Sequence, residues 1–239
     1  MSAAALFIAA ASDLVYCLDE LNTRFSAANP GAELRVSTGS SGNFTAQIRH
    51  GAPFDIFLSA DQSYPQALID SGDAVASSLT PYAVGRLVLW TRRDDIDVSQ
   101  GLSVLANPQV RTFAIANPEH APYGRAAQAA LEKAGLWQTL ADKRVTGDNI
   151  AQTLQFVQSG NADAGIVALS LVKAPVLAGQ GHYAILPLNS HPRLDQAAVI
   201  TRHGRQNSWA QRYMRWLRSP SARAILDRNG FLLPATPTP

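Results

Sequence analysis

Four short segments of this 239-residue chain share one position in the sequence pattern: an apolar run of strand length ends there, and a pattern of helical period begins. The segments are residues 11–14, 39–43, 121–124 and 147–150. Each predicts a strand followed at once by a helix N-terminus. Repeated strand-to-helix junctions of this kind favour an α/β fold.

The first 80 residues alternate between predicted strands and predicted helices. We expect strands at residues 6–11, 33–37 and 54–59, and helices near 14–25, 44–48 and 64–71. This alternation is typical of a mainly parallel sheet with helices on both faces, in which ligands bind beyond the carboxyl ends of the strands.

A second unit of the same kind begins near residue 84. It contains predicted strands at 87–90, 112–116 and 164–167 and predicted helices at 124–134 and 150–158, and a further strand at 197–200 and two helices over 207–230 follow. We expect these last helices to pack on the first unit.

The expected result is a chain of two lobes. Residues 1–82 and 194–239 form lobe one, which is therefore discontinuous, and residues 83–193 form lobe two. The chain should cross between the lobes near residues 81–84 and 190–197, where we expect hinges. The tail, residues 234–239, is expected to fray.

Composition limits the possible partners. Lys and Arg number 20 against 18 Asp and Glu, a formal charge of +2, which does not indicate nucleic acid or an anionic membrane surface. No apolar run reaches the roughly 20 residues that span a bilayer, and residues 1–5 lack a signal-peptide pattern, so an exported protein would be present here in its mature form. Cys17 is expected in a helix core. The five histidines show no metal-ligand spacing, so no metal centre or cofactor is expected.

The four predicted helix N-termini are rich in hydroxyl groups and contain no Lys. The first N–H groups of a helix have no partner within it, and the helix dipole is positive there, so several such ends at one point form a receptor for a small anion. A tetrahedral oxyanion without protons needs donors only. Hydroxyls and amides supply them without a buried counter-charge. The pattern therefore predicts an oxyanion-binding protein.

Four stretches resemble the periplasmic molybdate-binding proteins of ABC importers. They are AAAS (9–12), SS (40–41), GAPFDIFLSAD (51–61) and PEHAPYG (118–124), and the similarity runs in order over nearly the whole chain. The resemblance implies a type II periplasmic-binding-protein fold with its ligand in the cleft between the lobes. It further implies a periplasmic, monomeric protein that binds molybdate and tungstate and delivers them to a membrane permease.

By position, the resemblance also implies the ligand contacts. Ser12 and Ser41 would contribute from lobe one, with Ser40 as a second contact there, and the backbone N–H groups of Tyr123 and Ile150 from lobe two. Hinge closure would bring both sets onto one anion. Each serine could instead serve only as a helix cap, and Tyr123 could be an ordinary half-buried aromatic residue.

Two positions depart from the family pattern. Some members place a tyrosine hydroxyl on the anion where this chain has Ala168, and we expect the phenol of Tyr123 to compensate. Asp13 stands where an apolar residue is usual. A carboxylate beside a dianion would repel it unless the side chain, in the first helical turn, points outward to solvent. An acid beside the site also keeps phosphate, which carries a proton, among the candidate ligands.

Other functions stay open at this point. The same fold could bind sulfate, phosphate or a small carboxylate, or serve as the ligand-sensing domain of a transcription regulator, which would need a DNA-binding segment absent before residue 6. An enzyme is not expected, because the sequence contains no Gly-x-Ser-x-Gly elbow, no phosphate-binding Gly-x-x-x-x-Gly-Lys loop and no convincing pair of carboxylates.

Overall fold

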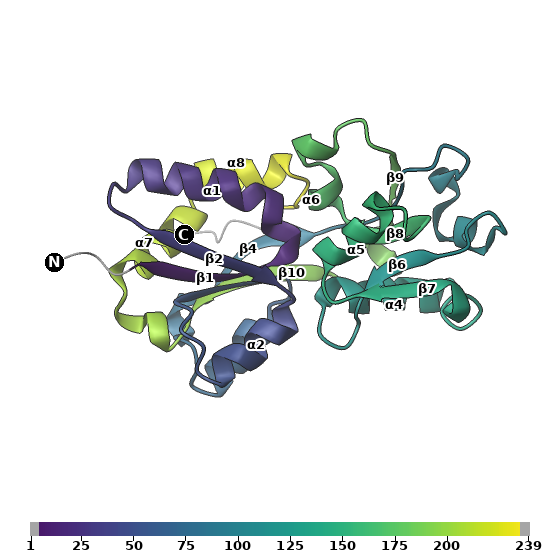
Figure 1. The fold of residues 1–239 in the computed structure, drawn as a ribbon. Coiled ribbons are helices and arrows are strands. Elements are labelled where there is room, and N and C mark those ends of the chain that lie inside the picture. Colours follow the sequence, from purple (N-terminus) through teal and green to yellow (C-terminus); the bar gives the residue numbers. More distant parts are fainter. Residues whose placement is uncertain (1–4, 235–239) are drawn as a thin grey trace.

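The computed structural model describes residues 5–234, and these form two lobes, each built on a five-stranded sheet (Figure 1). The sheet of lobe one contains, in spatial order, β2 (Leu34–Gly39), β1 (Leu6–Ala11), β3 (Ile56–Ser59), β10 (Leu194–Ile200) and β4 (Thr80–Gly85). The sheet of lobe two contains β7 (Arg144–Gly147), β6 (Phe113–Ala116), β8 (Ala164–Ala168), β5 (Leu87–Thr91) and β9 (His182–Ile185).

Helices cover both faces of the first sheet. On one face α1 (Val15–Ala28), α7 (Ser208–Leu217) and α8 (Pro220–Arg228) share one apolar core, and on the other α2 (Ser41–Arg49) and α3 (Ser63–Asp70) share a smaller one. The two last helices thus pack on lobe one, as predicted, and Figure 1 shows α8 beside α1. Short 3₁₀ turns complete the lobe: η1 (Ser12–Leu14), η2 (Ala76–Ser78) and η7 (His203–Gln206).

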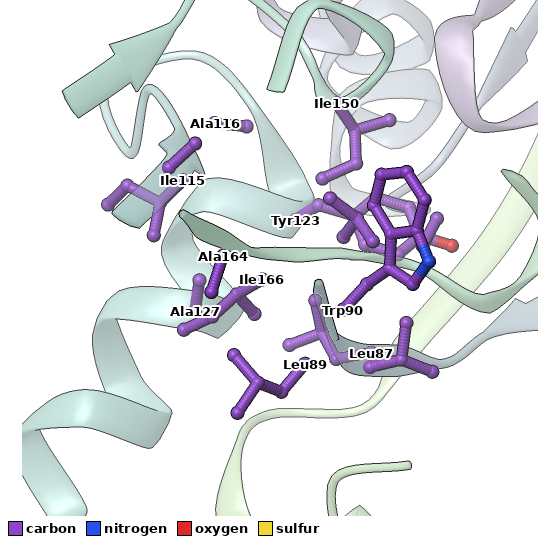
Figure 2. Close-up of a cluster of buried hydrophobic side chains, with 14 of the residues drawn as sticks. Leu87, Leu89, Trp90, Ile115, Ala116, Tyr123, Ala127, Ile150, Ala164 and Ile166 are labelled. Atoms are coloured by element: carbon purple, nitrogen blue, oxygen red, sulfur yellow. The ribbon is translucent and has the colours of Figure 1, made fainter. Parts of the chain in front are cut away.

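Lobe two is organised around a single large core. Leu89, Ile166 and Ala127 lie in its centre with no exposed surface, and Figure 2 shows them among the other buried side chains of the cluster. Its helices are α4 (Pro122–Lys133), α5 (Ile150–Gln158) and α6 (Leu169–Val172), joined by 3₁₀ segments η3 (Val98–Ala106), η4 (Ala141–Lys143), η5 (Pro175–Leu177) and η6 (Leu188–Ser190).

Both sheets are mixed rather than mainly parallel. In lobe one β1 is parallel to β2 and β3, whereas β10 is antiparallel to β3 and β4. In lobe two β6 is parallel to β7 and β8, whereas β5 is antiparallel to β8 and β9. The antiparallel strands belong to the parts of the chain that enter or leave a lobe. The alternation of strands and helices in the sequence therefore predicts only the parallel strands of each sheet.

Strand β4 was not predicted, and because of it the first crossing between the lobes lies later in the chain than predicted. Its sequence contains Pro81 and Gly85, which disfavour strands, but β4 is an edge strand, where the missing N–H of a proline is tolerated. The predicted boundary at 82/83 therefore falls inside a strand of lobe one, and the chain passes to β5 at Arg86. The return, predicted at 194, coincides with the start of β10. Hinge motion at these places stays a prediction.

Two predictions concern the ends of the chain. Residues 1–4 and 235–239, which include most of the predicted frayed tail and of the segment checked for a signal peptide, lie outside the described residues. Across residues 5–234, none of the helices combines the length and the apolar character needed to span a membrane.

Candidate functional site: an anion pocket between the lobes

A small pocket lies between the lobes, where strands of both sheets end. Residues 11–13, 39–41 and Ala60 line it from lobe one, and residues 121–123 and Ile150 line it from lobe two. The space inside it, counted together with the open solvent at its mouth, is about 200 Å³. All five predicted site residues, Ser12, Ser40, Ser41, Tyr123 and Ile150, contribute to its wall. Residues more than 100 positions apart in sequence thus meet at one point.

The start of α5 offers a single free backbone donor to the pocket. The side-chain oxygen of Asn149 caps the helix by accepting from the N–H groups of Ala151 and Gln152, each at 3.0 Å. Ile150 is the first residue of the helix, so its N–H has no partner within α5. At the start of α4, Pro122 is the first residue and lacks an N–H, so Tyr123 provides the first amide.

The start of α2 separates a capping serine from a donor serine. Ser40 is the N-cap, and its Oγ accepts from the N–H of Asn43 at 3.3 Å. Ser41 follows as the first helical residue, and its Oγ accepts from the N–H of Ala60 at 3.0 Å. That bond fixes the hydroxyl oxygen while leaving its proton for donation. The capping interpretation therefore applies to Ser40 and does not apply to Ser41.

Ser12 lies in η1 and is 3% exposed. Ala11 occupies the N-cap position there, and no side chain caps the turn. Within residues 5–234 no hydrogen bond engages the Ser12 hydroxyl, although the residue lines the pocket. Ser12 and Ser41 thus both line the pocket, and each has a hydroxyl proton that no residue of 5–234 accepts.

Asp13 does not face solvent, so the condition under which its carboxylate would not repel a dianion is not met. It is 1% exposed, and its Oδ2 accepts from the Tyr123 hydroxyl at 2.9 Å and from Gln196 Nε2 at 2.6 Å. Gln196 is held in turn by the Tyr82 hydroxyl, which donates to its Oε1 at 2.8 Å. Gly85 makes room for this cluster, because a Cβ there would lie 2.3 Å from the Tyr123 hydroxyl oxygen. We call these four side chains, Asp13, Tyr82, Tyr123 and Gln196, the Asp13 cluster.

The same bond corrects the expected role of the Tyr123 phenol. A phenol has one proton, and here that proton is donated to Asp13 across the lobe boundary. Tyr123 is 2% exposed and belongs to the buried cluster of lobe two together with Ile150 (Figure 2). Its hydroxyl therefore does not replace the donor that is missing at Ala168. The backbone N–H of Tyr123 remains the predicted donor from this residue.

Burial governs the ionisation of the Asp13 cluster. Loss of solvent raises the pKa of Asp13 from its usual 3.8 to about 6, although the bonds from Gln196 and Tyr123 favour the charged form. Burial also raises the pKa of Tyr123 and of Tyr82 well above 10, so both phenols are neutral at physiological pH. The cluster therefore holds one carboxyl group that can change charge near neutral pH.

Direct contacts hold the two lobes together around the pocket. The Gly42 N–H donates to the His120 carbonyl at 2.9 Å, and Ser170 Oγ donates to the Asp13 carbonyl at 2.7 Å. Farther from the pocket, Arg125 pairs with Asp61 at 2.7 Å. These contacts join residues of both lobes, so the structure represents a closed arrangement.

Sequence reasoning did not identify Gln196, Tyr82, Ser170 or Gly42 as parts of this site. The one available signal was Gln196, a polar residue inside the apolar strand β10. A buried amide side chain needs a hydrogen-bond partner, so this residue indicated a buried polar contact. That partner, Asp13, is 183 residues away. No local pattern could indicate it.

The remaining candidate groups lie apart from the pocket. Cys17 is buried, as predicted for a core residue, and its thiol donates to the Leu14 carbonyl. In the described part of the chain, no three or more His, Cys, Asp or Glu side chains come together in a way that could hold a metal ion.

Comparison with known proteins places this chain in a family. The family profile described as bacterial extracellular solute-binding protein matches residues 6–232. The molybdate-binding protein ModA of Azotobacter vinelandii is 37% identical over 230 residues, 96% of this chain and 90% of that protein. ModA of Rhodobacter capsulatus is 38% identical over 202 residues, 84% and 78% of the two chains.

The fold agrees with these sequence relationships. The solved structure of the Azotobacter vinelandii periplasmic molybdate-binding protein superimposes with a TM-score of 0.91 at 34% identity, covering 96% of this chain and all of that one. The similarity in sequence and the similarity in fold therefore support the same family assignment. The chain belongs to the family of bacterial extracellular solute-binding proteins.

Proposed function

We propose that this protein binds molybdate, and the nearly isosteric tungstate, as a dianion in the pocket between its lobes. It then delivers the anion to an ABC-type permease in the membrane. The observation that carries the proposal is the convergence of uncommitted donors: the hydroxyls of Ser12 and Ser41 and the first N–H groups of α2, α4 and α5 border one pocket. The named relatives are molybdate-binding proteins, which supports this ligand.

The number of donors is adequate for tight binding. Hydrogen bonds to a charged group contribute about 1.5–3 kcal/mol each, so about five of them give roughly 8–15 kcal/mol before entropic costs. Micromolar to nanomolar affinity requires about 8–12 kcal/mol. No Lys or Arg side chain is among the pocket-lining residues, so neutral donors carry the recognition.

Closure links binding to delivery. Lobe one offers Ser12 and Ser41, lobe two offers the N–H groups of Tyr123 and Ile150, and a single anion can meet both sets only when the lobes are together. Bound ligand therefore favours the closed state, and a permease can distinguish loaded from empty protein by lobe geometry. We propose that the protein acts in the periplasm as a monomer, without a cofactor and without catalysis.

Calorimetric titration of the dialysed protein with molybdate, tungstate, sulfate and phosphate at one pH and salt concentration tests the proposal. We expect one-to-one binding of molybdate and tungstate, with sulfate and phosphate much weaker. Sulfate is smaller and cannot reach every donor at once. Preferred binding of phosphate, or no response to any of the four anions, would refute the assignment of molybdate.

The variant Tyr123→Phe separates the phenol of this residue from its backbone amide. We expect molybdate affinity at pH 6 to stay within about threefold of wild type, because the phenol donates to Asp13 rather than into the pocket. The free energy of unfolding should fall by about 1–2 kcal/mol from the lost bond to the carboxyl group. Calorimetry and thermal unfolding measure the two effects. A large loss of affinity would mean that the hydroxyl reaches the anion.

A further inference from the structure

The two carboxyl oxygens of Asp13 have different environments. Oδ2 accepts two hydrogen bonds, from Tyr123 and Gln196. Oδ1 is completely buried and has no hydrogen-bond partner among residues 5–234. Asp13 itself is part of the pocket wall. A polar atom in this position costs free energy unless it finds a partner.

Among residues 5–234, no cationic side chain bonds to the Asp13 carboxyl group or contributes to its pKa shift. The ionisable groups that face it are Tyr123 on α4, Tyr82 on β4 and Cys17 on α1, and burial raises the pKa of each, so all are neutral near pH 7. Gln196 faces it from β10, while α5 and α6, which pack against η1, contain no ionisable side chain. Asp19 and Glu20, farther along α1, act on the Cys17 thiol, and Glu20 is paired with Arg24 and Arg228.

A tetrahedral dianion such as molybdate presents acceptor oxygens only. Beside an ionised Oδ1 it would be repelled, whereas a protonated Oδ1 would donate one more hydrogen bond to it. We propose that Asp13 binds the anion as a neutral carboxylic acid with its proton on Oδ1, so that each dianion bound takes up one proton from solution. This inference rests on the proposed function and adds a specificity-determining residue to the site.

The pKa of Asp13 in the closed state without ligand agrees with this coupling of anion binding to proton uptake. The pKa of Asp13 is raised to about 6 by burial, so the group is mostly charged at pH 7 to 8 and is protonated at little cost. A dianion in the pocket raises that pKa further. Above about pH 6, binding must therefore include the uptake of one proton from solution, and affinity should fall about tenfold for each pH unit.

The coupling also affects the choice of ligand. An anion that carries its own proton, such as monohydrogen phosphate, could donate that proton to an ionised Oδ1. It would then bind without proton uptake. Molybdate and monohydrogen phosphate should therefore differ in the number of protons taken up, whatever their relative affinities.

Titration of the wild-type protein with sodium molybdate tests the inference directly. Calorimetry at pH 7.5 in Tris and in HEPES, which differ in ionisation enthalpy, gives the number of protons taken up per anion. We expect a value near one, and an affinity that falls about 100-fold between pH 6.5 and pH 8.5. In Asp13→Asn an amide nitrogen takes the place of Oδ1 and donates at every pH. Proton uptake should then be near zero, and the pH dependence should be lost.

Asp61→Asn is the matched control. It also removes a carboxylate that makes a contact between the lobes, to Arg125, but Asp61 is not part of the pocket wall. Proton uptake should stay near one in this variant. If Asp13→Asn does not fold, the number of protons that the wild-type protein takes up per anion is sufficient to test the role of Asp13.

The outcomes separate the two proposals. Tight molybdate binding without proton uptake would overturn the role of Asp13 and leave the proposed function intact. A folded Asp13→Asn protein that binds no molybdate at pH 6.5 or 8.5 would also overturn it, since its amide should suffice as the donor. No molybdate binding by the wild-type protein at any pH would refute the proposed function itself.

Discussion

Replacing Gly42 with alanine is expected to weaken molybdate binding by about 100-fold or more while leaving both lobes folded. Gly42 lies in the first turn of α2, where its N–H donates to the His120 carbonyl in lobe two. A Cβ at this position would lie 2.6 Å from that carbonyl oxygen and 2.9 Å from the His120 Cα, against an ordinary contact distance of 3.4–4 Å. Backbone on both sides must then move apart.

The added methyl group acts beside the pocket. Separation of the lobes there lengthens the bonds from the Tyr123 and Ile150 amides, and the loss of two charge-assisted bonds costs about 3–6 kcal/mol. Within α2 alone, alanine is the better helix former by about 1 kcal/mol, so stability should be unchanged or slightly higher. Loss of affinity without loss of stability is the signature of impaired closure.

Calorimetry and thermal unfolding of Gly42→Ala measure these two effects. Gln47→Ala is the control, since it alters an exposed residue on the same helix, more than one turn away from the lobe contact. It should bind as wild type does. If Gly42→Ala binds molybdate within about threefold of wild type, the bound lobes do not approach as closely as the structure shows.

Ser41→Ala is expected to weaken molybdate binding by about 10- to 150-fold, equivalent to about 1.5–3 kcal/mol. The Ser41 hydroxyl oxygen is held by the Ala60 N–H at 3.0 Å, so its proton is oriented before the ligand arrives. Alanine removes that donor. It also leaves the Ala60 N–H without its acceptor, so the free energy of unfolding should fall by about 1–3 kcal/mol.

Ser40→Ala is the matched comparison for this prediction. Ser40 also lines the pocket, but its oxygen caps α2. Its loss should lower stability by about 1 kcal/mol and change affinity much less than the loss of Ser41. Affinities reduced equally in both variants would show that the two hydroxyls contribute alike. Unchanged affinity in Ser41→Ala would remove Ser41 from the site.

The part of the site that could be predicted from the sequence is the part with local causes. Asn149 and Ser40 are N-caps and Pro122 occupies a first helical position, and each acts within three residues of itself. Such signals indicate helix N-termini in any chain. They predicted the four helix N-termini, and the resemblance to molybdate-binding proteins then implied five residues there, all of which line one pocket in the structure.

The burial of Asp13 could not be predicted from the sequence, because its cause is not local. An acidic residue in a first helical turn usually faces solvent, and here its two partners are 110 and 183 residues away. The boundary at 82/83 was placed too early for a similar reason. Pro81 disfavours a strand, yet the edge of a sheet tolerates it, and the sequence does not show which strand lies at the edge.

The sequence by itself determined the α/β class and the helix ends that border the pocket, because hydrophobic period and capping act over a few residues. The tertiary structure alone decided that Asp13 is buried, that the Tyr123 phenol is committed to it, and that Gly42 must be a glycine for the lobes to meet. These features depend on the close approach of two lobes. Burial and contact between distant segments are consequences of packing, and packing is absent from any local stretch of sequence.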